Sequence, residues 1–366
     1  MSDEQFMRAA LSCAQIGLGR VNPNPLVGAV VVHHGVIIGR GGHEYFGGPH
    51  AERNALAACA DDPHGATIYV TLEPCCHTGK TPPCTDALIA AGITRVVVGC
   101  LDPNPLVAGR GVAALRAHGI AVATGVLTQE CAALNEPFLH FITTGRPLVV
   151  MKYAMTLDGK IATRTGASRW VSGEQSRERV QQDRHRWAAI MVGVGTVLAD
   201  DPHLTCRLPG SHSPLRIICD TRLRTPMDAA VVRTAHHTPT LLATCSTDTA
   251  RAEGYRQAGC EVMVLPTSEG HVDLRALCTA LGARGIDSVV LEGGARLNWS
   301  ALHAGIVNKI QAYLAPKLFG GADAPSPVAG IGVSDPSSAF QIGPPQLTRL
   351  GEDLLWESEV LQCSQA

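Results

Sequence analysis

Short apolar runs alternate with helical patterns along most of this chain. Runs of four to eight apolar residues between glycine, proline or asparagine predict strands, and apolar residues three or four positions apart predict helices. Their alternation predicts an α/β fold in which helices pack on a sheet. In the first 146 residues the predicted strands are 26–32, 36–39, 67–72, 95–99 and 120–126, and the predicted helices are 3–16, 51–58, 85–91 and 112–118.

A helical connector is predicted at 127–146, and it ends in the polar sequence Thr143-Thr144-Gly145-Arg146-Pro147. Polar segments that contain glycine and proline often link domains. At 366 residues the chain is long enough for two domains of ordinary size. The sequence therefore predicts one domain at 1–146 and a second at 147–366.

The second half continues the same alternation of apolar runs and helical patterns. It contains predicted strands at 148–154, 261–265, 289–291, 310–318 and 354–360, further apolar segments at 189–197, 215–220 and 240–244, and predicted helices at 175–187, at 273–281 and from 295 onward.

Charge and cysteine content narrow the class of protein. The net charge is −2, without a block of like charge, which argues against a nucleic-acid or membrane-surface binder. The longest uncharged apolar-rich run, 187–199, is too short to span a bilayer, and the acidic start lacks the order of a signal peptide. Thirteen scattered cysteines without such a signal indicate reduced thiols. We therefore expect a soluble, cytoplasmic protein.

Candidate chemistry lies between His50 and Cys84. The segment contains His50-Ala51-Glu52, a predicted strand, then Pro74-Cys75 and finally Cys84. Zinc binds imidazole nitrogen and thiolate sulfur in a tetrahedron, and three protein ligands leave one position for water. A carboxylate that is not a ligand can then move protons, as Glu52 would do in a zinc nucleobase deaminase. Pro49 and the helix-forming residues after Glu52 place His50 and Glu52 at a helix start.

The alternative is a closed structural zinc site, in which Cys76 or His77 supplies a fourth ligand. The eight residues between Cys75 and Cys84 also exceed the usual deaminase spacing of two. Glu52 argues for the catalytic site, because a structural site has no need of it.

Other candidate binding residues carry weaker signals. Asn24, in the stiff sequence Asn22-Pro23-Asn24-Pro25, offers a side-chain amide to a pyrimidine, although asparagine and proline also form plain turns. Gly293-Gly294, between a predicted strand and a predicted helix, suits an anion at the helix N-terminus. Residues 193–196 form a second predicted glycine turn, without the third glycine of a dinucleotide fingerprint, and either is also simply a tight turn. Arg184 and Arg207 can grip a phosphate, or be solvated charges.

Over essentially its full length, the chain resembles the bifunctional deaminase/reductase family of riboflavin biosynthesis. The first half matches through His50-Ala51-Glu52 and 71–75, and through Thr81-Pro82-Pro83-Cys84, with the long cysteine spacing included. The second half matches through 157–159, 168–170, 196–207 and 292–294. The resemblance implies a cytidine-deaminase-like three-layer α/β/α domain followed by a dihydrofolate-reductase-like α/β domain.

The resemblance also implies the two reactions. The first domain would hydrolytically remove the 2-amino group of 2,5-diamino-6-ribosylamino-4(3H)-pyrimidinone 5′-phosphate. The second would use NADPH to reduce the ribosyl group to ribityl, which gives 5-amino-6-(5-phospho-D-ribitylamino)uracil. One zinc ion and NADPH are the implied cofactors, and the phosphorylated pyrimidine is the implied partner. The resemblance leaves homo-oligomer formation open.

Site residues follow from the same resemblance. Zinc ligands are expected at His50, Cys75 and Cys84, with Glu52 as the catalytic proton carrier, although Cys76 stands where a small polar residue is expected and could exchange roles with Cys75. Deaminase substrate contacts are expected at Asn24, His43, His77 and Lys80. NADPH contacts are expected at Ala154, Trp170, Thr196, Asp200, Thr221, Gly294, Ala295, Arg296, Leu297, Asn298, Trp299 and Ser300. Contacts to the reductase substrate are expected at Ser168, Arg184, Leu204, Arg207 and Glu292.

Three other functions remain open at the level of sequence. The chain could be a zinc nucleobase deaminase whose second domain only binds a nucleotide. It could also be a tRNA-adenosine-type deaminase, although the near-neutral charge argues against RNA. The third alternative is a structural-zinc binding module, which a deaminase assay would distinguish.

Overall fold

Two sheets organise the chain, one in each of two units, Met1–Gly145 and Arg146–Ala366. The computed structural model describes residues 2–78 and 82–361. The first unit ends where Gly145 adopts a left-handed conformation, with φ of 68°, directly after helix α6 (Glu136–Thr144). This division lies one residue before the expected one.

The first unit contains a five-stranded sheet in the order β2-β1-β3-β4-β5. Strand β1 pairs antiparallel with β2 and β3, whereas β3, β4 and β5 run parallel. Its elements are α1 (Asp3–Ala14), the 3-10 turn Gln15–Gly17, β1 (Gly28–His33), β2 (Val36–Gly42), α2 (Ala51–Ala57), β3 (Thr67–Leu72), α3 (Cys84–Ala90), β4 (Arg95–Cys100), α4 (Arg110–Ala117), β5 (Ala121–Thr124), α5 (Thr128–Leu134) and α6.

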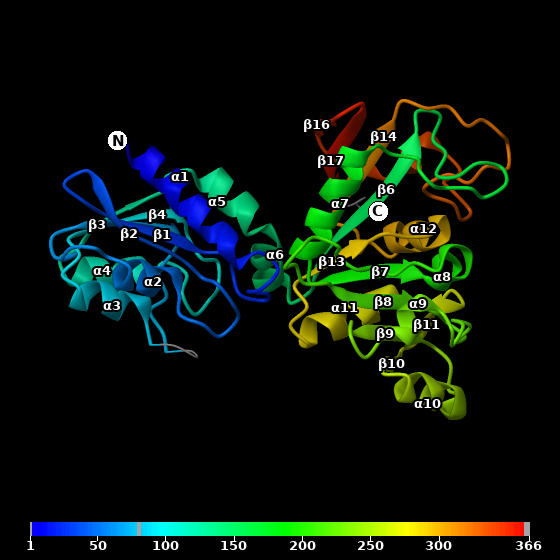
Figure 1. The fold of residues 1–366 in the computed structure, drawn as a ribbon, viewed down its shortest axis with the longest axis horizontal. Helices are drawn as coiled ribbons and strands as arrows, with labels where there is room; N and C mark the ends of the chain where they lie inside the picture. Colours follow the sequence, from blue (N-terminus) through cyan, green and yellow to red (C-terminus); the bar gives the residue numbers. More distant parts are fainter. Residues whose placement is uncertain (1, 79–81, 362–366) are drawn as a thin grey trace. The chain divides into compact units, whose positions relative to one another are not determined.

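Successive side chains along each strand point to opposite faces of the sheet, so the core of this unit has two halves, one on each face. Ala29 and Val31 of β1 pack with residues of α2, α3 and α4 on one face of the sheet. Val30 and Val32 pack with α1 and α5 on the other face (Figure 1). The helices thus cover both faces, and the expected three-layer α/β/α arrangement is confirmed.

The second unit contains a larger sheet whose path runs β10-β9-β8-β7-β13-β6-β14-β17-β15, with β16 paired to β17. The strands from β10 to β14 are parallel, and β17 adds an antiparallel edge beside β14. The elements of the parallel part are β6 (Leu148–Thr156), α7 (Glu174–Arg186), β7 (Ala189–Gly193), α8 (Val194–Asp200), β8 (Leu215–Cys219), α9 (Ala230–Arg233), β9 (Thr240–Thr244), α10 (Thr249–Gln257), β10 (Glu261–Val264), α11 (Leu274–Ala283), β13 (Ser288–Leu291), α12 (Ala295–His303) and β14 (Lys309–Ala315). The remaining elements are the small hairpin β11 (Thr267–Ser268) and β12 (His271–Val272), the 3-10 turn Pro336–Ser338, and the strands β15 (Gln341–Ile342), β16 (Gln346–Leu350) and β17 (Asp353–Leu361).

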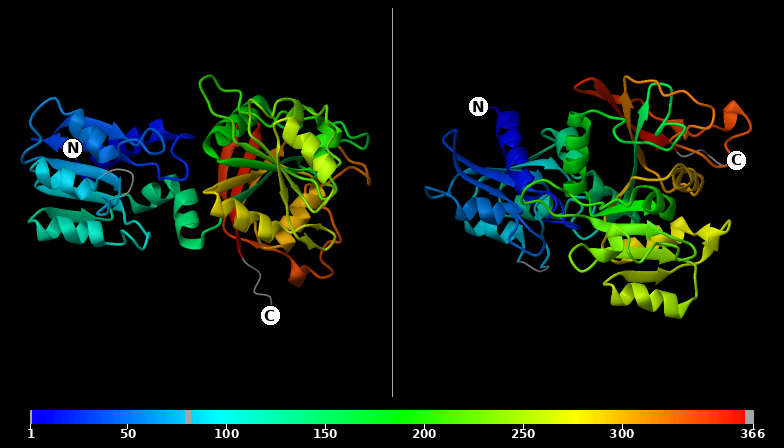
Figure 2. Two further views of the ribbon diagram at one scale, coloured as in Figure 1. Left: turned by 90° about the horizontal axis from the view of Figure 1, so that it is seen from below. Right: turned by 45° about the vertical axis from the view of Figure 1, so that its right-hand side comes forward.

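Helices cover both faces of the parallel part of this sheet (Figures 1 and 2). Helices α11 and α12 pack on one face through an apolar cluster that includes Leu277 and Ala301. Helices α8, α9 and α10 pack on the other face through a cluster that includes Val197 and Tyr255. All parallel strands therefore end at one edge of the sheet, which is where such sheets place binding sites.

Two sequence-based expectations for this unit were wrong in detail, and helix α10 is an element that was missed. The glycine turn expected at 193–196 is instead the first turn of α8, with Gly193 as its N-cap. The predicted strand 310–318 ends at Ala315. Helix α10 was not predicted, because only Ala252 and Tyr255 of its nine residues are buried and its apolar pattern is short.

Candidate active sites

A cluster of metal-ligating atoms lies at the edge of the first sheet. Nδ1 of His50 lies 3.4 Å from Sγ of Cys75 and 3.3 Å from Sγ of Cys84. Zinc bonded to nitrogen at about 2.0–2.1 Å and to sulfur at about 2.3 Å in a tetrahedron requires ligand atoms roughly 3.5 Å apart. The three residues therefore fit zinc in both chemistry and spacing.

Two connections between strands and helices deliver these ligands, one from β2 to α2 and one from β3 to α3. His50 is the N-cap of α2, Cys75 follows β3, and Cys84 is the first residue of α3. The backbone N–H of Cys84 donates to Sγ of Cys75 at 3.4 Å, and the hydrogen bond between the two thiols lowers the pKa of Cys75 below its usual range. The Cys75 thiolate that results is the form that binds a metal.

Cys76 does not join this cluster. Within 2–78 and 82–361, the metal-ligating group at this position consists of His50, Cys75 and Cys84. Sγ of Cys76 instead lies 3.9 Å from the carbonyl oxygen of Leu106. The geometry thus leaves a fourth metal position without a protein ligand among the described residues, as a catalytic site requires.

Glu52 lies beside the ligands, in the first turn of α2, and is 3% exposed. Burial and the neighbouring Cys75 thiolate raise the pKa of Glu52 to about 6. A carboxyl group with a pKa near the working pH can both accept and release a proton. The helix start expected at His50 is present, and it brings Glu52 to the same end of α2 as the imidazole.

The tautomer of His43 follows from its two neighbours. One ring nitrogen, Nδ1, lies 2.9 Å from the carbonyl oxygen of Pro49 and must donate to it. The other, Nε2, therefore accepts from the side-chain N–H of Asn24 at 3.1 Å. Burial lowers the pKa of His43 and keeps the ring neutral. The pair holds the Asn24 amide in one orientation at the wall of the cavity.

A cavity of about 260 Å³ connects these groups. Of the expected substrate contacts, it is lined by Asn24, His43 and His77. Nδ1 of His77 is buried and has no hydrogen-bond partner among the described residues, so a ligand in the cavity could satisfy it. Lys80 lies outside the described residues.

Asp102 and Asn104 also line this cavity, and sequence reasoning missed both. They follow β4 in the sequence Asp102-Pro103-Asn104-Pro105, which repeats the pattern of Asn22-Pro23-Asn24-Pro25. That repeated pattern was the signal that could have identified them.

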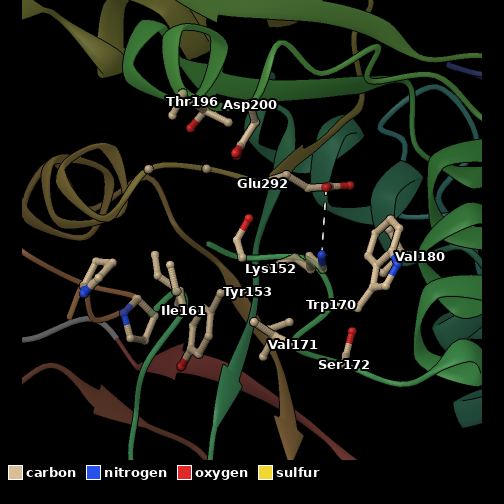
Figure 3. A pocket seen from close by; sticks show the side chains of 18 of the residues that line it. Lys152, Tyr153, Ile161, Trp170, Val171, Ser172, Val180, Thr196, Asp200 and Glu292 are labelled. Carbon is tan, nitrogen blue, oxygen red and sulfur yellow. Dashed lines mark ion pairs between the residues drawn. The ribbon is translucent and has the colours of Figure 1, made fainter. Parts of the chain in front are cut away.

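A second cavity, of about 520 Å³, lies in the second unit (Figure 3). Ten of the residues expected to bind NADPH or the reductase substrate line it: Ala154, Ser168, Trp170, Arg184, Thr196, Asp200, Arg207, Glu292, Gly294 and Asn298. Thr196 and Asp200 both come from α8, and Glu292 follows β13 (Figure 3).

Glu292 is the centre of a buried charge cluster in this cavity. Nε and Nη2 of Arg184 donate to its two carboxylate oxygens at 2.9 and 2.8 Å. Nζ of Lys152 lies 3.9 Å from Oε2 (Figure 3). Burial alone would raise the pKa of Glu292, but the charges of Arg184 and Lys152 lower it to about 2. Glu292 is therefore a carboxylate at any physiological pH.

Sequence reasoning missed Lys152, a cavity residue whose pKa burial lowers. Its ammonium lies 5.6 Å from the centre of the Tyr313 ring. A lysine within the otherwise apolar strand pattern 148–154 was the available signal, because lysine is almost never fully buried unless it is paired.

The two arginines expected to bind phosphate differ in their surroundings. Both side-chain edges of Arg184 are engaged, since Nη1 donates to the carbonyl oxygen of Thr205 at 3.1 Å in addition to the Glu292 pair. The guanidinium of Arg207 lines the cavity and makes no ion pair or hydrogen bond with any described residue. Arg207 is therefore the better candidate for a ligand phosphate.

The glycines after β13 bring a helix N-terminus to the cavity. Gly294 is the N-cap of α12 at φ of 78°, and a Cβ atom at Gly293 would lie 3.1 Å from Oγ1 of Thr196. Such a turn exposes backbone N–H groups to an anion.

Seven residues of the expected reductase set do not line the cavity: Thr221, Leu204, Ala295, Arg296, Leu297, Trp299 and Ser300. Leu204 and Leu297 pack in or against the apolar core, and Trp299 stacks on His303. The carbonyl oxygen of Thr221 accepts from the Cys245 N–H.

Across the described part of the chain, no helix has the length and apolar character needed to cross a membrane.

Comparisons with known proteins agree with this division into two sites. The family model for the cytidine and deoxycytidylate deaminase zinc-binding region matches residues 1–100, and that for the RibD C-terminal domain matches residues 147–355. The riboflavin biosynthesis protein RibD of Actinobacillus pleuropneumoniae is 52% identical over 99% of this chain and 96% of the relative. RibD of Aquifex aeolicus is 42% identical over 96% of this chain and 97% of the relative.

Solved structures give the same result. A diaminohydroxyphosphoribosylaminopyrimidine deaminase/5-amino-6-(5-phosphoribosylamino)uracil reductase from Thermotoga maritima is 39% identical, with a TM-score of 0.85 over 98% of this chain and 99% of that one. RibD of Acinetobacter baumannii is 34% identical, with a TM-score of 0.87 over the same shares. The expected fold class and resemblance are confirmed. This chain belongs to the RibD family of riboflavin biosynthesis proteins.

Proposed function

We propose that this chain catalyses two successive steps of riboflavin biosynthesis, deamination of a diaminopyrimidine ribosylamine 5′-phosphate and NADPH-dependent reduction of its ribosyl group. The observation that carries the proposal is the presence of both sites in one chain: the zinc-ligand cluster with Glu52, and the cavity around Glu292. Identity of 52% to a RibD protein extends over both units, which favours this function over a deaminase with a non-catalytic second domain.

We assign one activity to each unit, deamination to residues 1–146 and reduction to residues 147–366. The zinc ligands and the smaller cavity belong to the first unit, and the larger cavity belongs to the second. A phosphorylated pyrimidine and NADPH are the proposed small-molecule partners, without nucleic acid. The described cysteines are free thiols, which suits the reducing cytoplasm.

In the first unit the side chains suit hydrolytic deamination. Bound zinc supplies Lewis acidity, which lowers the pKa of water to about 7. Glu52 takes a proton from the attacking water and delivers protons to the leaving amino group, so that the C–N bond breaks and ammonia departs. Asn24, with its amide fixed by His43, and His77 offer hydrogen bonds to the pyrimidine edge. Lys80 is retained as a proposed contact.

In the second unit the side chains suit positioning of a hydride acceptor. NADPH, when bound, would supply the hydride for C1 of the sugar in its ring-opened imine form, and the attached nitrogen would then need a proton. Lys152 is placed to supply that proton, because its ammonium lies at the cavity wall, 3.9 Å from Oε2 of Glu292. Arg207 and Ser168 would hold the sugar phosphate, and Thr196, Asp200 and the turn at Gly294 would hold NADPH.

The first prediction concerns Glu52. Replacing Glu52 with glutamine should lower kcat for ammonia release by about 10²–10⁴-fold, because an amide cannot carry the proton. Zinc content, measured by elemental analysis, should stay at the wild-type level. The control Glu130→Gln, at an exposed site on α5, should leave the kcat for ammonia release and the zinc content unchanged. Normal deamination by Glu52→Gln would contradict the assignment.

The zinc ligands give a second prediction. Cys75→Ser and Cys84→Ser should each lose zinc and ammonia release, because a neutral hydroxyl is a poor replacement for thiolate on zinc. The adjacent control Cys76→Ser should retain both, since its sulfur lies outside the cluster. Equal zinc loss in the Cys76 variant would show that the ligand choice is wrong.

A third prediction separates the two activities. Arg207→Ala should raise the KM of the deaminated intermediate by about tenfold or more, if the phosphate contact contributes the ~1.5–3 kcal/mol of a charged hydrogen bond. NADPH oxidation measures this change, and ammonia release should be unaffected. Arg233→Ala, at an exposed position on α9, is the matched control. If Arg207→Ala lowered ammonia release and left NADPH oxidation intact, the assignment of reduction to the second unit would be refuted.

A further inference from the structure

Glu73 is a buried carboxylate between β3 and the candidate zinc ligand Cys75. Its side chain is 4% exposed, and its two oxygens accept three backbone N–H groups. Oε2 accepts from Asp102 at 3.4 Å and from Gly109 at 3.0 Å, and Oε1 accepts from Val112 at 3.1 Å. Among the described residues, no lysine or arginine forms an ion pair with Glu73.

All three donors belong to the segment that leads from β4 into α4. Asp102, Asn104 and Val107 of this segment line the deaminase cavity, and Glu73 itself also lines it. The backbone of Glu73 also donates to the carbonyl oxygen of Cys100 at 2.9 Å, next to the same segment. Glu73 therefore ties this cavity wall, residues 102–109, to the backbone that presents Cys75.

A carboxylate is specifically suited to this position. A buried charge is tolerated only when hydrogen bonds replace its lost hydration, and three N–H donors do so here. The N-terminus of α4 adds favourable partial positive charge. A glutamine at this position would keep the shape but direct an N–H₂ group at one or two of the donors.

Gly111 gives independent evidence for the closeness of this contact. A Cβ atom at Gly111 would lie 2.1 Å from the carbonyl oxygen of Pro74 and 3.2 Å from Oε1 of Glu73. The first turn of α4 can therefore approach the Glu73-Pro74 backbone only with glycine at this position. Alanine at position 111 would therefore push the start of α4, and with it the cavity wall, away from the Glu73-Pro74 backbone.

We propose that Glu73 is a positioning residue for deamination, which fixes the 102–109 wall of the substrate cavity relative to the zinc ligands. This inference rests on the proposed deaminase function. Glu73 lines the cavity, but both of its carboxylate oxygens are occupied by backbone N–H groups of the wall, so it acts through the wall rather than on the reacting atoms. Its loss should therefore affect substrate binding more than the chemical step.

The test compares full-length Glu73→Gln with the wild type. The KM for the diaminopyrimidine phosphate should rise about tenfold or more, while kcat changes less than about threefold and zinc content stays the same. Amide hydrogen exchange should accelerate in residues 101–112 and remain unchanged in β1. Gly111→Ala should reproduce the same pattern, and it provides the test if Glu73→Gln does not fold.

Val97→Ala is the control for lost stability alone, because Val97 is buried on the opposite face of the sheet, away from the cavity. A KM rise in this variant equal to that of Glu73→Gln would overturn the inference, as would loss of zinc or an unchanged KM in folded Glu73→Gln. A wild-type protein that releases no ammonia would instead refute the proposed function, so the two failures are distinguishable.

Discussion

Parallel strands end at one edge of a sheet, and both candidate sites depend on that constraint. In the first unit, Cys75 follows β3 and Asp102 follows β4, so that the candidate zinc ligand and the cavity wall emerge side by side from paired strands. In the second unit, Glu292 follows β13 and α8 follows the adjacent β7, which brings Thr196 to the Gly293 turn. The two folds differ, but in each the candidate site residues lie where strands lead into helices.

Buried glutamates then distinguish the two chemistries. Glu52 is buried beside the Cys75 thiolate, and both raise its pKa to about 6, which suits a group that exchanges protons. Glu292 forms ion pairs with Arg184 and Lys152, whose charges lower its pKa to about 2. Such a carboxylate stays charged and can hold the two cationic side chains in place. The same side chain thus has a mobile proton in one unit and none in the other, because their neighbours differ in charge.

The sequence was sufficient to predict the layered α/β fold and the motif that forms the zinc cluster, because both depend on local patterns. It could not predict that Arg184 is engaged by Glu292, since those residues are 108 positions apart. It also missed Lys152 and Asp102, whose importance comes from the cavities around them, and α10, which buries too few residues to show a clear period. The turn expected at 193–196 was wrong because Val194 begins a helix directly after Gly193.

The central claim is that one chain carries two independent activities, of which one requires zinc. The most direct measurement follows ammonia release and NADPH oxidation in a single purified preparation, before and after zinc is removed with a chelator. The account predicts that zinc removal abolishes ammonia release from the diaminopyrimidine phosphate, whereas NADPH oxidation continues when the deaminated intermediate is supplied. Ammonia release that persists without zinc, or a zinc-loaded protein that never oxidises NADPH with that intermediate, would contradict it.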